Sequence, residues 1–234
     1  MISSFSRSAK TYNEWAIPQN EVAYFLSQLI ESQTLSGNIL DAGCGTGLLS
    51  RHLLKRDQNI NILGVDISQD MLNLYQTVNP LTLYSDMESL PFVDEHFDHT
   101  LSSFSLHWTD ILKSIKELIR VSSKYISFAL PIDGSLEDFK FPFPCSEKIF
   151  QLLEANNVSI THWECHQVKI PFTNMDLIKY FHYTGTSINS SNRKGLMNHE
   201  KLNETIKRFQ DKEFYYIILY VVGKKITLAE ASIH

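Results

Sequence analysis

The sequence predicts an α/β fold in which helices cover both faces of a mostly parallel sheet. In the first half of the chain, short apolar runs alternate with segments of helical period, which is typical of repeated strand–helix units. The strand-like run 38–42 leads directly into a loop with glycine at every second position, Gly43, Gly45 and Gly47. Such a loop before a helix lets backbone N–H groups approach a bound nucleoside where a Cβ would clash.

The elements of this first half follow one another in a regular order. An amphipathic helix is expected at 21–31, before the sheet. The expected strands are 38–42, 60–66, 81–84, 97–103 and 125–130, and the expected helices between them are 48–56, 69–79 and 109–121. Ser68 is the predicted N-cap of the helix at 69–79.

Beyond Leu130 the regular alternation stops, because several prolines and a glycine break the chain into expected loops. Two further strands are predicted at 159–170 and 214–223, with an insertion at 173–211 between them whose part 198–210 has helical spacing. Near the N-terminus, Phe5, Ala9, Tyr12 and Ala16 form one stripe of a helix. This helix either docks on the core or forms a lid with the Tyr12 hydroxyl at the ligand.

Composition excludes several classes of function. The 234 residues carry a net charge of −5, so a broad electrostatic grip on nucleic acid is not expected. The longest apolar run, 214–222, is too short to span a membrane, and no signal peptide is apparent, so the expected location is the cytoplasm. His162, Cys165 and His166 lie in a predicted strand whose alternation separates them, so no metal site is expected.

The glycine loop also indicates which nucleoside is bound. A dinucleotide fingerprint requires a third glycine at position 48, which is Leu48. Asp41, two residues before Gly43, would repel a pyrophosphate and favour a cationic amino-acid end. The candidate residues of this loop are Asp41, Gly43, Cys44, Gly45 and Gly47.

Two more acids follow the ends of predicted strands. Asp66, with Ile67 beside it, ends the second strand and is placed to accept both ribose hydroxyls, although a helix N-cap is the alternative. Asp86 follows the third strand and is a candidate for the adenine amino group, with Met87 packing on the ring. For this pair the alternative is a polar turn with a core methionine. All three acids are expected at one edge of the sheet.

The segment 41–47 resembles the first motif of class I S-adenosylmethionine-dependent methyltransferases. The flanking segments narrow the resemblance to the malonyl-acyl-carrier-protein O-methyltransferases of biotin synthesis. Residues 5–12 are similar to that family's F-x-R-A-A-x-x-Y opening, 102–108 to its S-N-L-A-x-Q-W segment, and 128–136 to its F-x-T-x-x-x-G-S-L stretch. Ser103, His107 and Tyr183-Thr184-Gly185 depart from the residues common in the family.

The resemblance implies one Rossmann-like domain over 1–234, with a seven-stranded sheet whose last strand is antiparallel. It divides the chain into N-terminal lid helices at 1–35, a cofactor-binding core at 36–130 and an acceptor-side insertion at 173–211. It also places Ser103 at the cofactor. The residues after the fourth strand, His107 and Trp108, become candidates for the acceptor pocket, although capping and packing are the alternative for His107.

The implied reaction transfers a methyl group from S-adenosylmethionine to the free carboxylate of a malonyl thioester on acyl-carrier protein or coenzyme A. Arg193, with Lys194 behind it, is the candidate donor to that carboxylate. The segment 193–225 holds eight basic and four acidic residues, which is a candidate docking face for an acidic carrier protein. Alternatives are a methyltransferase with another small acceptor, such as an aconitate-type acid or a quinone precursor, and a non-catalytic nucleoside-binding protein.

Overall fold

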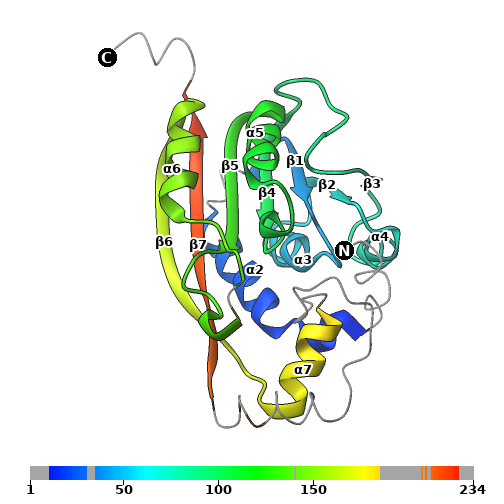
Figure 1. Ribbon diagram of the computed structural model, residues 1–234. Helices are drawn as coiled ribbons and strands as arrows, with labels where there is room; N and C mark the ends of the chain where they lie inside the picture. The colour runs from blue at the N-terminus through cyan, green and yellow to red at the C-terminus, as the bar shows by residue number, and fades with distance from the viewer. Residues whose placement is uncertain are drawn as a thin grey trace.

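In the described part of the chain, seven strands form one sheet in the order β3-β2-β1-β4-β5-β7-β6 (Figure 1). The computed structural model describes residues 11–30, 35–139, 141–184, 207, 209 and 212–226. The strands are β1 (Asn38–Ala42), β2 (Asn61–Asp66), β3 (Thr82–Tyr84), β4 (Phe97–Ser103), β5 (Ser122–Pro131), β6 (Val158–Ile170) and β7 (Phe214–Lys225). All neighbouring pairs from β3 to β5 are parallel, whereas β7 is antiparallel to both β5 and β6. The predicted fold class and the antiparallel last strand are therefore confirmed.

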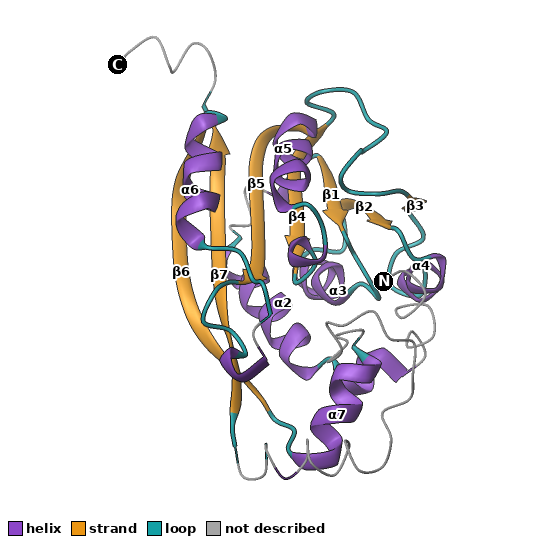
Figure 2. Ribbon diagram, in the orientation of Figure 1, coloured by secondary structure: helices purple, strands orange, loops and turns teal. Residues whose placement is uncertain are grey.

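Helices flank this sheet on both faces (Figure 2). They are α2 (Ile17–Leu29), α3 (Leu48–Arg56), α4 (Gln69–Tyr75), α5 (Ile111–Val121), α6 (Ser146–Ala155) and α7 (Asn174–Tyr183). Residues 11–15 are also helical, and Leu106–Trp108 form a 3₁₀ turn after β4. No helix within the described residues is long and apolar enough to cross a membrane.

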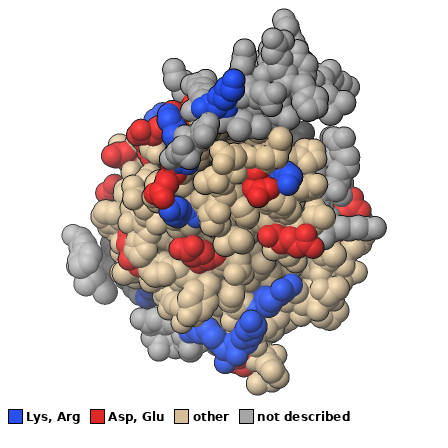
Figure 3. Space-filling view, turned by 90° about the horizontal axis from the view of Figure 1, so that it is seen from below, with Lys and Arg blue, Asp and Glu red and all other residues tan. Residues whose placement is uncertain are grey.

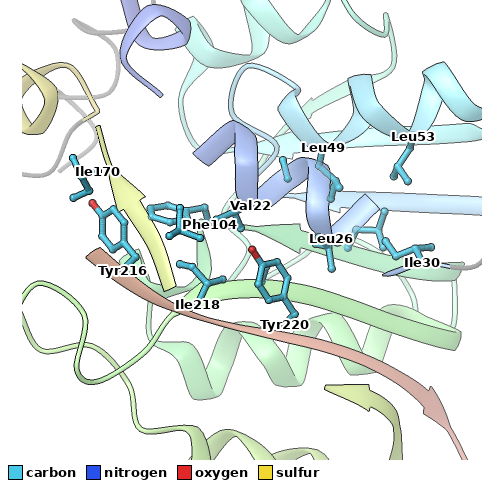
Figure 4. Close-up of a cluster of buried hydrophobic side chains, with 14 of the residues drawn as sticks. Val22, Leu26, Ile30, Leu49, Leu53, Phe104, Ile170, Tyr216, Ile218 and Tyr220 are labelled. Carbon is cyan, nitrogen blue, oxygen red and sulfur yellow. The ribbon is translucent and has the colours of Figure 1, made fainter. Parts of the chain in front are cut away.

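Two apolar layers hold the helices to the sheet. On one face, α2 and α3 pack through side chains such as Val22, Leu26 and Leu53 against the sheet (Figure 4). On the other face, Ile115 of α5 and Leu153 of α6 belong to a second buried cluster. The alternation of side chains along the buried strands feeds both layers, as parallel strands with two covered faces require.

Several expected bounds differ from the observed ones by one to three residues, and three differences are larger. The helix expected at 21–31 begins at Ile17, because Pro18 fits the first helical turn, where its missing N–H is not needed. The helix expected at 69–79 ends at Tyr75, where a turn begins in which the N–H groups of Val78 and Asn79 both donate to the Tyr75 carbonyl. The expected loops after Leu130 include α6, which begins only two residues after Pro144.

The carboxyl ends of the parallel strands position the site. Asp41 of β1 lies beside Gly64 of β2 and Leu101 of β4 in the sheet, so the loops that follow these three strands start at the same edge. In Figure 1 this edge faces downward, toward α7. Parallel α/β sheets bind their ligands at this edge.

Candidate functional site

A cavity opens at the carboxyl ends of β1, β2, β3 and β4. Of the residues predicted from the sequence, those that line it are Tyr12, Asp41, Gly43, Cys44, Gly45, Asp66, Ile67, Asp86, Met87, Ser103 and Trp108. Two predicted residues do not line it. Gly47 is the N-cap of α3 and lies beside the Tyr75 ring, and His107 belongs to the 3₁₀ turn after β4. Arg193 and Lys194 lie outside the described residues.

The glycine loop contributes space to this cavity more than hydrogen-bond donors. The N–H groups of Gly43 and Cys44 both donate to the carbonyl of Val65, at 2.8 and 3.0 Å. The N–H of Gly45 donates to Asp66 Oδ2 at 2.9 Å. These three amides therefore form hydrogen bonds within the protein. The sequence-based prediction that the loop presents its amides to the ligand is corrected for these three.

Two glycines of the loop are needed for different reasons. A Cβ on Gly43 would lie 2.4 Å from Met87 Cε and 2.5 Å from Ser105 Oγ, so Gly43 allows the loops after β1, β3 and β4 to pack together. Gly45 has a φ of +52°, and a Cβ on it would meet nothing within 4 Å. Since Gly45 lines the cavity, the open space beside it is space for a ligand.

Asp41 is a buried acid with one strong internal partner. Its side chain is 1% exposed, and Ser50 Oγ donates to its Oδ2 at 2.6 Å. Burial raises the pKa of Asp41 to about 6, and the negative charge of Asp66 adds to this effect. Burial also raises the pKa of Asp66, although the N–H groups of Ser68 and Gly45 donate to its two oxygens. A cation bound between these carboxylates would stabilise their charged forms.

The remaining lining fits S-adenosylmethionine. Among the described residues that line the cavity, four are acidic and none is Lys, Arg or His; the acids are Asp41, Asp66, Asp86 and Glu88. This charge suits the sulfonium and ammonium groups of that cofactor. Ser103 Oγ is buried in the cavity wall with no hydrogen-bond partner among the described residues, as expected if a ligand supplies one.

Aromatic rings surround His107. Its imidazole meets the ring of Phe104 edge-on at 5.1 Å and lies 4.6 Å from Trp108 and 5.8 Å from Phe143. Burial lowers the pKa of His107 to about 3, so the imidazole is neutral near pH 7. The contacts of His107 are therefore those expected of a packing residue, whereas Trp108 lines the cavity.

Sequence reasoning missed Gln19, a buried polar residue of the cavity wall. Gln19 lies on α2, whose start was expected four residues later, and is 3% exposed. Its position is three and four residues before the buried Val22 and Ala23, so the helical period places it on their face. A polar residue on the buried face of a helix is the signal that could have identified it.

The comparisons with known proteins agree with this geometry. Residues 40–125 match the methyltransferase domain family model. A SAM-dependent methyltransferase of Thermotoga maritima has a TM-score of 0.60 and 16% identity, covering 97% of this chain and 100% of that one. Magnesium protoporphyrin IX methyltransferase of Synechocystis, solved with bound SAM, has a TM-score of 0.54 and 16% identity, covering 89% and 79%. Residues 40–125 therefore form a methyltransferase domain, and the solved methyltransferases share the fold of the chain.

Its curated relatives are more specific. The malonyl-[acyl-carrier protein] O-methyltransferase of Buchnera aphidicola is 26% identical over 235 residues, which is 93% of each chain. The enzyme of the same name from Hamiltonella defensa is 35% identical over 141 residues, or 58% of this chain and 54% of that one. The chain is thus similar to malonyl-acyl-carrier-protein O-methyltransferases, along its length in one case and over about half the relative's length in the other.

Proposed function

We propose that the chain transfers a methyl group from S-adenosylmethionine to the free carboxylate of a malonyl thioester. The thioester is carried on acyl-carrier protein or coenzyme A, and the methyl ester enters pimeloyl and biotin synthesis in the cytoplasm. The observation that carries this proposal is the alignment with the Buchnera enzyme, which extends well beyond the matched domain at 40–125 to 93% of the chain.

The proposed reaction asks little acid–base chemistry of the protein. A carboxylate with a reference pKa near ~4 is already ionised at neutral pH, so no general base is required. The cofactor supplies an electrophilic methyl group on a cationic sulfur. Asp41 would favour the cationic end of the cofactor, while Tyr12 and Trp108 would exclude water and hold the acceptor in line.

The cofactor roles assigned from the sequence agree with the cavity. Asp66, with Ile67, is proposed to bind the ribose, and Ser103 to bind the cofactor near its reacting end. Asp86 and Met87 are proposed to hold the adenine. Met87 is buried, as a residue that packs on a ring should be, and Asp86 is exposed at the rim of the cavity.

The proposed domain spans 1–234, with lid helices at 1–35 and a cofactor-binding core at 36–130. The proposed acceptor side of this domain is the insertion at 173–211. Arg193 is proposed to bind the acceptor carboxylate, and the segment 193–225 to dock an acidic carrier protein. In Figure 3, the Lys and Arg side chains of the described residues lie in several places on the face seen from below, among Asp and Glu side chains. Within that segment, Lys212 pairs with Asp138 and Lys225 with Glu95, two acids outside the segment.

The direct test is methyl transfer from labelled S-adenosylmethionine to a panel of acceptors. The panel holds malonyl-acyl-carrier protein, malonyl-coenzyme A, an aconitate-type acid and a quinone precursor. The proposal requires that a malonyl thioester be methylated with the highest kcat/KM and that acetyl-coenzyme A, which lacks the free carboxylate, accept no methyl. Transfer to another acid alone would assign a different acceptor, and cofactor binding without transfer would indicate a non-catalytic protein.

A further inference from the structure

Gln19 lines the cavity and has one side-chain atom without a hydrogen-bond partner among the described residues. Its Nε2 donates to the Tyr180 hydroxyl at 3.0 Å, whereas its Oε1 is buried without a partner among the described residues. Leaving a buried amide atom unpaired lowers the stability of the folded protein. Because Gln19 lines the cavity, its unpaired amide atom is accounted for if a bound ligand completes the hydrogen bonds of the amide.

The Gln19 amide is one end of a buried chain of polar groups. The Tyr180 hydroxyl of α7 donates to the Tyr216 hydroxyl of β7 at 3.1 Å, and both rings are within the core. Burial holds the pKa of Tyr180 well above its ordinary value, so this hydroxyl stays protonated. Because a hydroxyl can donate or accept, a half-turn of the amide is accommodated. Tyr180 then donates to Oε1, and the N–H₂ group points into the cavity.

The place of α2 indicates which part of the ligand Gln19 meets. This helix packs against α3 and against β4, β5, β6 and β7. Asp66 and Asp86 lie at the ends of β2 and β3, on the other side of β1. Gln19 therefore lies away from the loops assigned to ribose and adenine, among lining residues such as Ala23 and Phe104. This is the region left for the acceptor.

The negative charge of the cavity lining disfavours an anionic acceptor unless hydrogen-bond donors stabilise it. The lining contains four acids and, within the described residues, no basic side chain. A carboxylate acceptor entering this wall needs hydrogen bonds from groups such as an amide N–H₂. An amide also leaves more of the negative charge on the reacting oxygen than an ion pair would.

We propose that Gln19 is a positioning residue that binds the acceptor's free carboxylate through its amide N–H₂, with Tyr180 and Tyr216 fixing the amide's orientation. This inference rests on the proposed carboxyl methylation. It adds a neutral contact on α2 to the recognition assigned to Arg193.

The test compares Gln19→Leu and Gln19→Glu with the wild-type protein, using malonyl-coenzyme A as acceptor. Gln19→Leu should raise the KM for malonyl-coenzyme A about tenfold, since one hydrogen bond to a charged group is lost. The Kd for S-adenosylmethionine, measured by calorimetry, should stay within about twofold. Gln28→Leu is the matched control, because Gln28 lies on the same helix but bonds to Ser27 Oγ and does not line the cavity.

The pH dependence of the KM in Gln19→Glu distinguishes a contact with the acceptor from a purely structural role. Near pH 8 its introduced carboxylate should repel the acceptor, so the KM should rise more than in Gln19→Leu. As the pH falls, protonation of that buried carboxyl restores an O–H donor, and the KM should approach the wild-type value. A pH profile of Gln19→Glu parallel to that of the wild type would overturn the role of Gln19.

The outcomes separate the two proposals. A wild-type protein that methylates no malonyl thioester overturns the proposed function and the ligand assigned to Gln19 together. An active wild type with an unchanged KM in Gln19→Leu overturns the assignment of Gln19 alone. A rise in the Kd for S-adenosylmethionine equal to the rise in KM places Gln19 at the cofactor and equally overturns it.

Discussion

The two ends of the cavity use different chemistry. At the nucleoside end, carboxylates lie at the ends of neighbouring strands: Asp41 is the second-last residue of β1, and Asp66 is the last residue of β2. Away from those acids the wall is made of an amide and aromatic rings, including Gln19 and Phe104. Fixed negative charge suits a cationic donor, and neutral groups suit an anionic acceptor. The difference between the ends therefore matches a reaction between partners of opposite charge.

The acidic end lowers the stability of the free protein. Because the pKa of Asp41 in the folded chain is raised to about 6, the folded state binds a proton more tightly than the unfolded state does. Its contribution therefore becomes less favourable as the pH rises from about 4 through 6. A bound cation reverses this effect, so cofactor binding and stability are linked most strongly at this end of the cavity.

The largest effect is expected when the acid assigned to the ribose is removed from the acidic end of the cavity. Asp66→Ala should weaken S-adenosylmethionine binding by roughly 1–3 kcal/mol, because ribose hydroxyls and the amides of Gly45 and Ser68 lose their acceptor. Calorimetric titration measures the loss. Asp70→Ala, an exposed acid in the first turn of α4, is the matched control and should leave affinity unchanged. A folded Asp66→Ala protein with wild-type affinity would remove Asp66 from the site.

A second prediction distinguishes backbone strain at a glycine from steric exclusion of the cofactor by an added Cβ. Gly45→Ala and Gly134→Ala both place a Cβ on a residue of positive φ, +52° and +86°, so each should lower the free energy of unfolding by about 1 kcal/mol. A Cβ on Gly134 would make only an ordinary contact, 3.5 Å from Ile217 Cγ1, away from the cavity lining. Only Gly45→Ala should therefore reduce cofactor affinity, by about tenfold.

Equal affinities in Gly45→Ala and Gly134→Ala would contradict the prediction that the space beside Gly45 belongs to the ligand. Calorimetry gives the affinities and urea denaturation gives the two unfolding free energies, so strain and steric exclusion are measured separately.

The nucleoside end could be predicted from the sequence because its signals are local. Asp41, Asp66 and Asp86 each follow an apolar run, and parallel strands bring such ends to one edge whatever lies between them. The structure places all three at the cavity. What the sequence does not encode locally is hydrogen bonding across the loop, where Gly45 donates to Asp66 twenty-one residues away.

The acceptor end could not be predicted in the same way. Gln19 and Tyr180 meet across 161 residues, and Tyr180 and Tyr216 belong to two different elements, α7 and β7. Nothing in the spacing of three separate segments specifies that contact. The docking of His107 against Phe143 is similar, because Phe143 lies in the region expected to be loop. Tertiary packing alone brings these side chains together.

A third prediction concerns the neutral end and pH. Because the folded-state pKa of His107 is about 3, below its ordinary value near 6.5, the unfolded chain binds a proton that the folded chain does not. The stabilising contribution is full above about pH 6.5 and is lost as the pH falls. Between pH 7.5 and 5.8 the wild type should thus lose about 1 kcal/mol more unfolding free energy than His107→Gln.

Urea denaturation at the two pH values measures this difference, and all other titrating groups are shared by the two proteins. The exposed His96→Gln is the control for the loss of a histidine elsewhere in the chain. Identical pH dependence in His107→Gln and the wild type would mean that the imidazole is accessible to protons in the folded state.

The smallest expected effect concerns how the acceptor arrives. Lys207 is exposed, and Arg208, which lies outside the described residues, follows it in the basic segment 193–225. Replacing both with glutamate should lower the association rate for malonyl-acyl-carrier protein several-fold at low salt, because an acidic partner is steered by positive charge.

The effect should fade as salt is added, since exposed charges are screened over about 8–10 Å at physiological ionic strength. Stopped-flow association and activity on malonyl-coenzyme A are measured in parallel. The small thioester should keep its kcat/KM, because it reaches the neutral end of the cavity without docking a protein. If both substrates respond alike, the charge change acts inside the acceptor end and not at a docking face.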